Sequence, residues 1–228
     1  MRCYCKSSLV CLSVFALLIA AGCGGDDEGD DPAASIKGGA SSGSSSDVGS
    51  SSKPSAPVDP LRPVVLIDTS YGEITVRLDA KLAPLTVDNF LSYVKDGHYD
   101  QTIFHDVFKG QGIVGGGYTE DRKEKKTLGT VRNEADNGLK NNRGTIAMAR
   151  SPDAIDSATC QFFFNLADNP VLDHKDRNLG GYGYCVFGKV VDGLDVVDKI
   201  GKVEVHQVDP FDQFPVETVL IKSIRCIR

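Results

Sequence analysis

The 228-residue sequence contains two sets of residues whose type and spacing could do chemistry, its histidines and a glycine-rich run. The 4 histidines are scattered and lack the spacing of metal ligands, so we expect no metal site. Residues 110–115 (GQGIVG) have the spacing of a dinucleotide-binding turn. The charged segment after them does not predict the helix that such a turn requires, so we also expect no cofactor.

The segment before Cys23 has the features of an export signal. Basic residues near the start precede an apolar stretch, residues 8–21, that is too short for a comfortable membrane span. The stretch ends in Ala20-Ala21-Gly22-Cys23, which resembles the bacterial lipoprotein box. This resemblance implies a signal peptide over residues 1–22 and lipidation of Cys23. An ordinary signal peptide, cut after a small residue of the same segment, is the alternative.

Residues 23–63 are predicted to form a flexible tether. They are rich in Gly, Ser, Pro and Asp and have almost no apolar side chains, so they cannot bury enough surface to offset the entropy cost of ordering. Such a chain spans on the order of 35 Å on average. The tether would hold the one folded domain, residues 64–228, away from a membrane surface.

The predicted domain contains three cysteines, Cys160, Cys185 and Cys226. Their odd number argues against a disulfide framework, and we expect all three to be small buried apolar residues. A single disulfide is the alternative in an exported protein. The net charge of −6 and the lack of a basic stripe argue against a nucleic-acid partner.

Apolar periodicity predicts a mainly β domain of about seven strands and two helices. Residues 73–79 alternate cleanly between apolar and polar side chains, as a half-buried strand does. A helix is predicted from Pro84 to just before Gly97, with one apolar stripe. The pattern favours a closed or nearly closed antiparallel barrel with helices over its ends. The remaining predicted strands cover residues 64–68, 102–108, 145–149, 161–166, 184–190 and 218–227, and the second helix covers residues 194–200.

Several motifs follow one another along this domain and together resemble those of bacterial cyclophilins. They are residues 81–105 (KLAPLTVDNFLSYVKDGHYDQTIFH), 133–141 (NEADNGLKN), 143–150 (RGTIAMAR), 157–163 (SATCQFF) and 183–193 (GYCVFGKVVDG). The resemblance implies a closed eight-stranded antiparallel barrel capped by two helices. It also implies peptidyl-prolyl cis–trans isomerase activity.

Rotation about an X–Pro bond faces a barrier of about 18–20 kcal/mol that comes from amide resonance. A catalyst lowers this barrier by donating a hydrogen bond to the imide nitrogen of the twisted state and by gripping the proline ring in an apolar pocket. The resemblance implies an arginine donor directly after a Phe-His pair. It also implies a pocket that contains a phenylalanine, a methionine and a glutamine from the next loop.

The sequence departs from this pattern at four positions. Asp106 follows Phe104-His105 where the arginine is expected, and a carboxylate cannot donate a hydrogen bond unless it is protonated. Gln111 and Gly112 replace the phenylalanine and the methionine, and Val114 replaces the glutamine. We therefore expect a low rate, with Arg150 on the neighbouring strand edge as a hypothetical substitute donor.

At most of the other groove positions, the residues are of the types that the resemblance implies. His105 is expected to be buried beside the groove, and Tyr184 is the bacterial variant of a family histidine. Val171 stands where an aromatic side chain is common, so a thinner far wall is expected. The full predicted substrate-binding set is His105, Gln111, Gly112, Val114, Ala149, Arg150, Gln161, Phe163, Leu172 and Tyr184.

These features predict a lipid-anchored prolyl isomerase that faces the cell envelope, with the periplasmic face expected. Its substrates would be proline-containing segments of exported polypeptides, and we expect a monomer. The alternative is a cyclophilin-fold module that binds proline-containing peptides, as a holdase or interaction protein, without isomerising them. The family resemblance supports the first function, and the four departures support the second.

Overall fold

The computed structural model describes residues 59–228. The predicted signal peptide, Cys23 and almost all of the predicted tether lie outside the described residues. The strands are β1 (Val64–Thr69), β2 (Gly72–Leu78), β3 (Thr102–Phe108), β4 (Gly112–Thr119), β5 (Thr145–Met148), β6 (Phe162–Asn165), β7 (Val186–Asp192), β8 (Val205–Val208), β9 (Phe211–Pro215) and β10 (Val219–Cys226). The helices are α1 (Pro84–Lys95), α2 (Leu194–Ile200) and the 3-10 turns η2 (Ala135–Asn137) and η3 (Pro170–Leu172).

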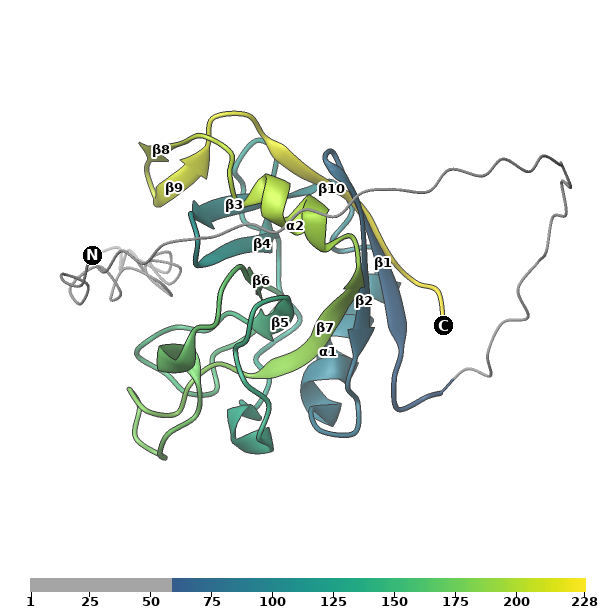
Figure 1. Ribbon diagram of the computed structural model, residues 1–228, viewed down its shortest axis with the longest axis vertical. Coiled ribbons are helices and arrows are strands. Elements are labelled where there is room, and N and C mark those ends of the chain that lie inside the picture. Colours follow the sequence, from purple (N-terminus) through teal and green to yellow (C-terminus); the bar gives the residue numbers. More distant parts are fainter. Residues whose placement is uncertain (1–58) are drawn as a thin grey trace, which may run out of the picture. The chain divides into compact units, whose positions relative to one another are not determined.

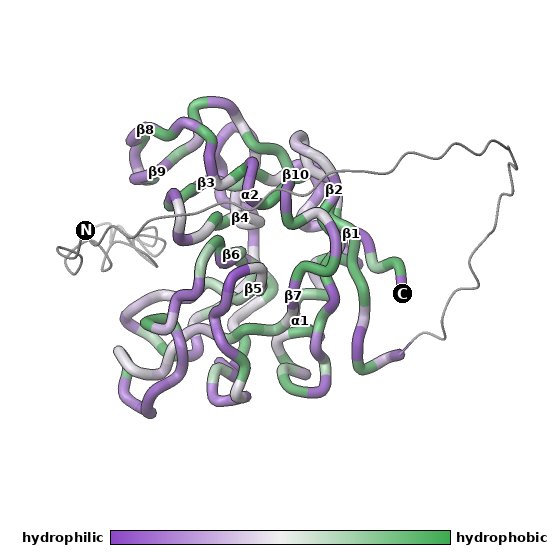
Figure 2. The backbone as a smooth tube through the Cα atoms, in the orientation of Figure 1, coloured by the Kyte–Doolittle hydropathy of each residue, from purple (hydrophilic) through white to green (hydrophobic). Residues whose placement is uncertain are grey.

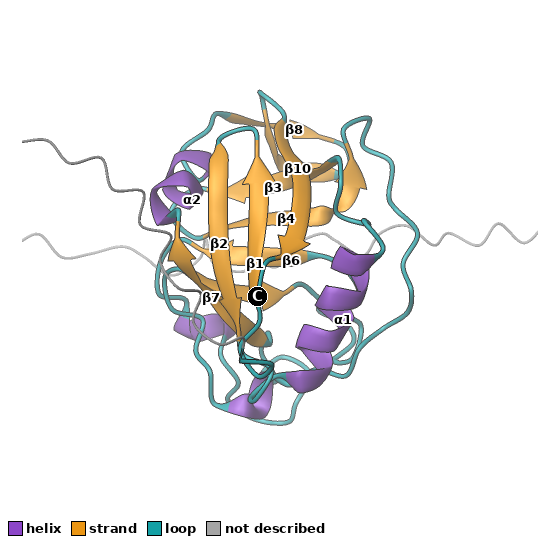
Figure 3. Ribbon diagram, turned by 90° about the vertical axis from the view of Figure 1, so that its right-hand side faces the viewer, coloured by secondary structure: helices purple, strands orange, loops and turns teal. Residues whose placement is uncertain are grey.

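Eight of these strands close into one barrel in the order β1-β10-β3-β4-β6-β5-β7-β2, and β8 and β9 form a separate hairpin. Every neighbouring pair in the barrel is antiparallel. Figure 1 shows the hairpin beside β3, and Figure 3 shows β2, β1 and β10 side by side with α1 and α2 at opposite sides of the barrel. The predicted fold class, a mainly β closed barrel with two helices, is confirmed.

The barrel closes around alternate side chains of its strands. Val65 and Ile67 of β1 pair with Val76 and Ile74 of β2, and all four side chains are completely buried. Both helices contribute apolar residues to the same core, for example Phe90 of α1. Figure 2 shows hydrophobic segments along the barrel strands, whereas the long loops around β5 and before β7 are largely hydrophilic. Removing this alternating apolar surface from water is the main driving force for the fold.

Helix α1 obtains its N-terminal cap from a residue far along the chain. Ala83 at the N-cap position offers no side-chain acceptor. The carboxylate of Glu134 instead accepts hydrogen bonds from the backbone N–H groups of Leu85 and Thr86, at 3.2 and 2.8 Å. A negative charge at this end also complements the helix dipole. Glu134 therefore joins the loop before η2 to α1.

The structure contains strands that the periodicity did not predict. The prediction of about seven strands left out β4, which contains Gly115, Gly116 and Gly117, and the hairpin of β8 and β9. Glycine has a low strand propensity, so a glycine run looks like a loop in the sequence. In the barrel a Cβ on Gly116 would come within 2.8 Å of Phe162 and 2.9 Å of Tyr99. These glycines thus leave room for the aromatic core.

The prediction that all three domain cysteines are buried was wrong for Cys226. Cys160 and Cys185 are buried, whereas Cys226 is exposed, and all three are free thiols. Cys226 is the last residue of β10, where the strand leaves the barrel near the end of the chain. No helix within residues 59–228 is long and apolar enough to cross a membrane.

Candidate functional site

Cross-strand pairing aligns residues of four strands in one row. Asp106 on β3 pairs with Val114 on β4, Val114 with Phe163 on β6, and Phe163 with Ala147 on β5. Opposed residues of antiparallel strands project from the same face of the sheet. Both neighbours of Phe163 in β6 belong to the barrel core, so the row, called here the groove row, lies on the outer face. Figure 1 shows these four strands next to one another.

Asp106 is the one ionisable residue of the groove row, and it is only 5% exposed. Its Oδ1 atom accepts a hydrogen bond from the backbone N–H of Gln213 in β9 at 3.1 Å. The pKa of Asp106 is raised to about 7, and burial is the main cause. The bond from Gln213 opposes this rise, and the Asp212 carboxylate adds to it. Near neutral pH, Asp106 is therefore divided between a charged acceptor and a neutral acid that can donate.

His105 is completely buried, as the resemblance implied. Its ring lies 4.8 Å from the ring of Tyr118 and 5.3 Å from that of Phe211, measured between centroids. Burial lowers the pKa of His105 to about 3, although hydrogen bonds with the backbone of Ile103 and the side chain of Gln161 oppose the shift. His105 is therefore neutral at physiological pH and orients Gln161.

Gln111 and Gly112 lie where β3 turns into β4. The backbone N–H of Gln111 donates to the carbonyl of Phe108 at 2.9 Å and closes the turn. The carbonyl of Gln111 accepts bonds from the N–H of Leu166 and the side-chain amide of Asn169, at 2.9 and 3.0 Å. The turn is thus fixed by its backbone, and the Gln111 side chain is half-buried.

Phe163 of the groove row forms an apolar wall together with Leu172 and Tyr184. The Phe163 and Tyr184 rings meet edge to face, with centroids 5.8 Å apart and planes at 82°. Leu172 is buried, and its carbonyl accepts a hydrogen bond from the N–H of Tyr184 at 2.9 Å. Val171, by contrast, is 44% exposed, so this side chain is largely open to solvent.

Ala149 and Arg150 directly follow β5, and both are buried. The N–H of Ala149 donates to the carbonyl of Gln161 at 2.9 Å. The Arg150 guanidinium donates to backbone carbonyls, including that of Gly183 at 2.9 Å, and stacks on the Tyr184 ring. These bonds would have to break before Arg150 could act as a substitute donor, and that hypothesis remains a prediction.

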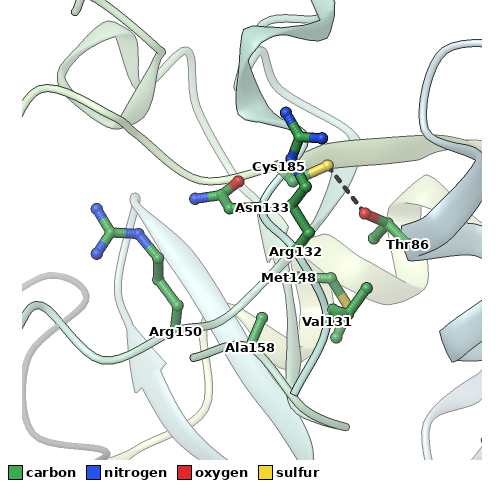
Figure 4. A pocket seen from close by; sticks show the side chains of 8 residues that line it. All are labelled: Thr86, Val131, Arg132, Asn133, Met148, Arg150, Ala158 and Cys185. Atoms are coloured by element: carbon green, nitrogen blue, oxygen red, sulfur yellow. Dashed lines mark hydrogen bonds between the residues drawn. The ribbon is translucent and has the colours of Figure 1, made fainter. Parts of the chain in front are cut away.

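A crevice behind β5 does not offer a second binding site. The eight residues labelled in Figure 4 line it, and the Thr86 hydroxyl lies 3.3 Å from the Cys185 thiol across it. The crevice has no room for a water molecule. It therefore cannot hold a peptide side chain without rearrangement.

Sequence reasoning missed the contribution of the hairpin formed by β8 and β9. Phe211 and Phe214 pack against Ile103 of β3, and the backbone of Gln213 bonds to Asp106. One signal was present in the sequence: Asp209-Pro210 is a turn dipeptide between two apolar stretches. The packing of this hairpin against β3 is a long-range contact that no local sequence pattern predicts.

The closed antiparallel barrel, its two helices and the groove row define a cyclophilin-like barrel. The sequence profile of the family described as cyclophilin type peptidyl-prolyl cis-trans isomerase/CLD matches residues 64–226. The chain therefore belongs to the cyclophilin-type peptidyl-prolyl cis–trans isomerases, and the predicted enzyme class is confirmed at this level.

Individual relatives agree with this assignment. The chain is 49% identical to peptidyl-prolyl cis-trans isomerase A of Dickeya dadantii, over 72% of this chain and 84% of that protein. It is 47% identical to peptidyl-prolyl cis-trans isomerase B of Escherichia coli, over 71% of this chain and 98% of that protein. A crystal structure of a cyclophilin type isomerase from Cryptosporidium parvum superposes with a TM-score of 0.60 and 25% identity, covering 73% of this chain and 98% of that one.

Proposed function

We propose that this chain isomerises X–Pro bonds of exported polypeptides, as a monomer, at a rate below that of family members with an arginine donor. The observation that carries the proposal is the groove row, in which apolar Val114 and Phe163 lie in register beside Asp106. An apolar surface of this kind can hold a proline ring while the other side of the imide bond rotates.

The reduced rate follows from the chemistry of Asp106. Its carboxylate is buried and accepts the N–H of Gln213, so in its charged form it offers the imide nitrogen no proton. Loss of one donor aimed at the transition state commonly costs about 10²–10³ in rate. The apolar grip and the exclusion of water would supply the remaining acceleration.

A second candidate function is binding without isomerisation. The burial of Asp106 under β9 favours it, because the side chain that should reach the imide nitrogen is used within the fold. The wall of Phe163, Leu172 and Tyr184 is retained, so peptide binding does not depend on the donor. Such a module would act as a holdase or interaction protein.

One pair of measurements separates the two functions. A protease-coupled assay on a short X–Pro peptide gives the isomerisation rate, and calorimetry gives the affinity for the same peptide. We expect binding together with a slow but measurable acceleration over the uncatalysed rate. Binding without acceleration would favour the second function, and absence of both would contradict both proposals.

We further propose that the chain is exported and anchored to the cell envelope by lipid on Cys23, facing the periplasm. The support is the apolar stretch that ends in Ala20-Ala21-Gly22-Cys23, followed by the tether. Cys23→Ser should move the protein from the membrane fraction to the soluble envelope fraction. Equal fractionation of the variant and the native protein would show that the lipid assignment is wrong.

A further inference from the structure

Arg150 is a buried cation that is surrounded by backbone carbonyls. The side chain is 8% exposed. Its Nε atom donates to the carbonyl of Gly183 at 2.9 Å, and Nη2 donates to that of Leu179 at 3.1 Å. Its Nη1 atom donates to the carbonyls of Ser151 and Ala154, at 2.8 and 3.4 Å. One guanidinium therefore joins the end of β5 to a distant loop.

That loop, residues 173–183, leads from η3 into Tyr184. Arg150 holds it at two places, the exposed Leu179 and the buried Gly183. The peptide group of Gly183 directly precedes Tyr184, so the bond at Gly183 also restrains the backbone of Tyr184. The planar fork of a guanidinium can make these bonds together, whereas a lysine ammonium cannot reproduce the geometry.

Arg150 also contacts the ring of Tyr184 directly. Its Cζ atom lies 4.9 Å from the centroid of that ring, in a cation–π arrangement. The same ring meets Phe163 of the groove row edge to face. In Figure 4 the Arg150 side chain extends away from Thr86, Met148 and Cys185, on the far side of the crevice. Arg150 therefore packs directly on one side chain of the apolar wall.

We propose that Arg150 is a positioning residue, which fixes the loop of residues 173–183 and the Tyr184 ring so that the wall for the substrate proline is formed before substrate arrives. This inference rests on the proposed function. A wall that is already ordered avoids the entropy cost of ordering it on binding. Arg150 therefore acts on substrate affinity, and the chemical step depends on other groups.

The test uses the full-length chain with Arg150→Lys, and with Arg225→Lys as the matched control. Arg225 also makes two short side-chain bonds, but to Asp100, and it is exposed. Arg150→Lys should weaken binding of an X–Pro peptide about fivefold to tenfold and raise KM with little change in kcat. The Arg225→Lys control should keep the affinity of the native chain.

A second measurement reads the positioning without any substrate. Amide hydrogen exchange of residues 173–184 should become at least about tenfold faster in Arg150→Lys, while exchange in β1 and β2 stays unchanged. Tyr184→Leu should give a similar loss of affinity, and combining it with Arg150→Lys should add little, because both changes remove the same support.

The possible failures are distinguishable. If the native chain neither binds nor isomerises X–Pro peptides, the proposed function fails and this inference with it. If the native chain is active but Arg150→Lys leaves both the affinity and the loop exchange unchanged, only the positioning role is overturned. A large fall in kcat at unchanged KM would overturn it in favour of a donor role for Arg150.

Discussion

Asp106 stands at the position where the sequence resemblance implies a cationic donor, and its environment is that of a buried acid. The substitution is readable in the sequence. The new hydrogen-bond partner of Asp106 cannot be read from the sequence, because the bond from Gln213 joins residues 107 positions apart. The raised pKa follows mainly from burial, which cannot be derived from local sequence either. At this scale the sequence identifies the changed residue, and the structure identifies its new partner.

The raised pKa predicts how Asp106 affects stability. A carboxyl whose pKa is higher in the folded than in the unfolded state favours folding at low pH, and that advantage is lost as pH rises from about 4 to about 7. The difference between 3.8 and about 7 corresponds to roughly 4 kcal/mol at most. Asp106→Asn, which keeps an acceptor for Gln213, should therefore be more stable than the native protein at pH 8.

Urea unfolding at pH 5 and pH 8 checks this prediction. The stability advantage of Asp106→Asn should shrink toward the lower pH, where the native carboxyl holds its proton. Asp212→Asn, which removes the neighbouring half-buried charge, should give a smaller change in the same direction. An advantage that is equal at both pH values would show that Asp106 does not titrate as a buried acid.

At the scale of elements, amphipathic periodicity predicted the helices and most barrel strands from the sequence. The helix over Leu194–Ile200 has the predicted bounds, and β3 does as well. Strand β4 was not predicted, because its glycines have no side chains and the sequence therefore shows no alternation of apolar and polar residues there. The role of these glycines is to leave room for aromatic side chains of β6 and of the loop before β3, and only the structure shows that these side chains pack against them.

Strand β4 supports a prediction with an internal control. Gly116 and Gly110 both have positive φ angles, of 86° and 73°, so alanine is strained at either position. A Cβ at Gly116 would meet Phe162 at 2.8 Å, whereas a Cβ at Gly110 meets nothing within 4 Å. Gly116→Ala should thus cost roughly 1–3 kcal/mol more than Gly110→Ala in chemical unfolding. Equal costs would mean that the barrel interior gives way easily at β4.

At the scale of the whole molecule, the composition predicted one folded domain at the end of a long polar segment. The barrel, with both helices packed on one core, begins at Val64. We expect this core to pack without the polar segment that precedes it. The order of the motifs along the chain carried the fold prediction, because no single motif is specific enough to do so.

The predicted tether therefore should not contribute to stability. Deleting residues 24–58 is expected to leave the midpoint of thermal unfolding unchanged within about 1 °C, since a segment with so few apolar side chains buries little surface. Differential scanning calorimetry of the two chains makes the comparison. A clear fall in the midpoint would place part of this segment against the barrel and move the domain boundary toward the N-terminus.

The central claim is that this cyclophilin-type chain isomerises slowly because the groove row and its turn lack four side chains. The most direct test restores Arg, Phe, Met and Gln together at Asp106, Gln111, Gly112 and Val114 and measures kcat/KM in the protease-coupled assay. We predict a gain of about 10²-fold or more, with Asp106→Arg alone giving only part of it, because residues that act as a unit are not additive. Circular dichroism verifies that each variant is folded. A native chain that is already fast, and that gains nothing from the folded fourfold variant, would contradict the account.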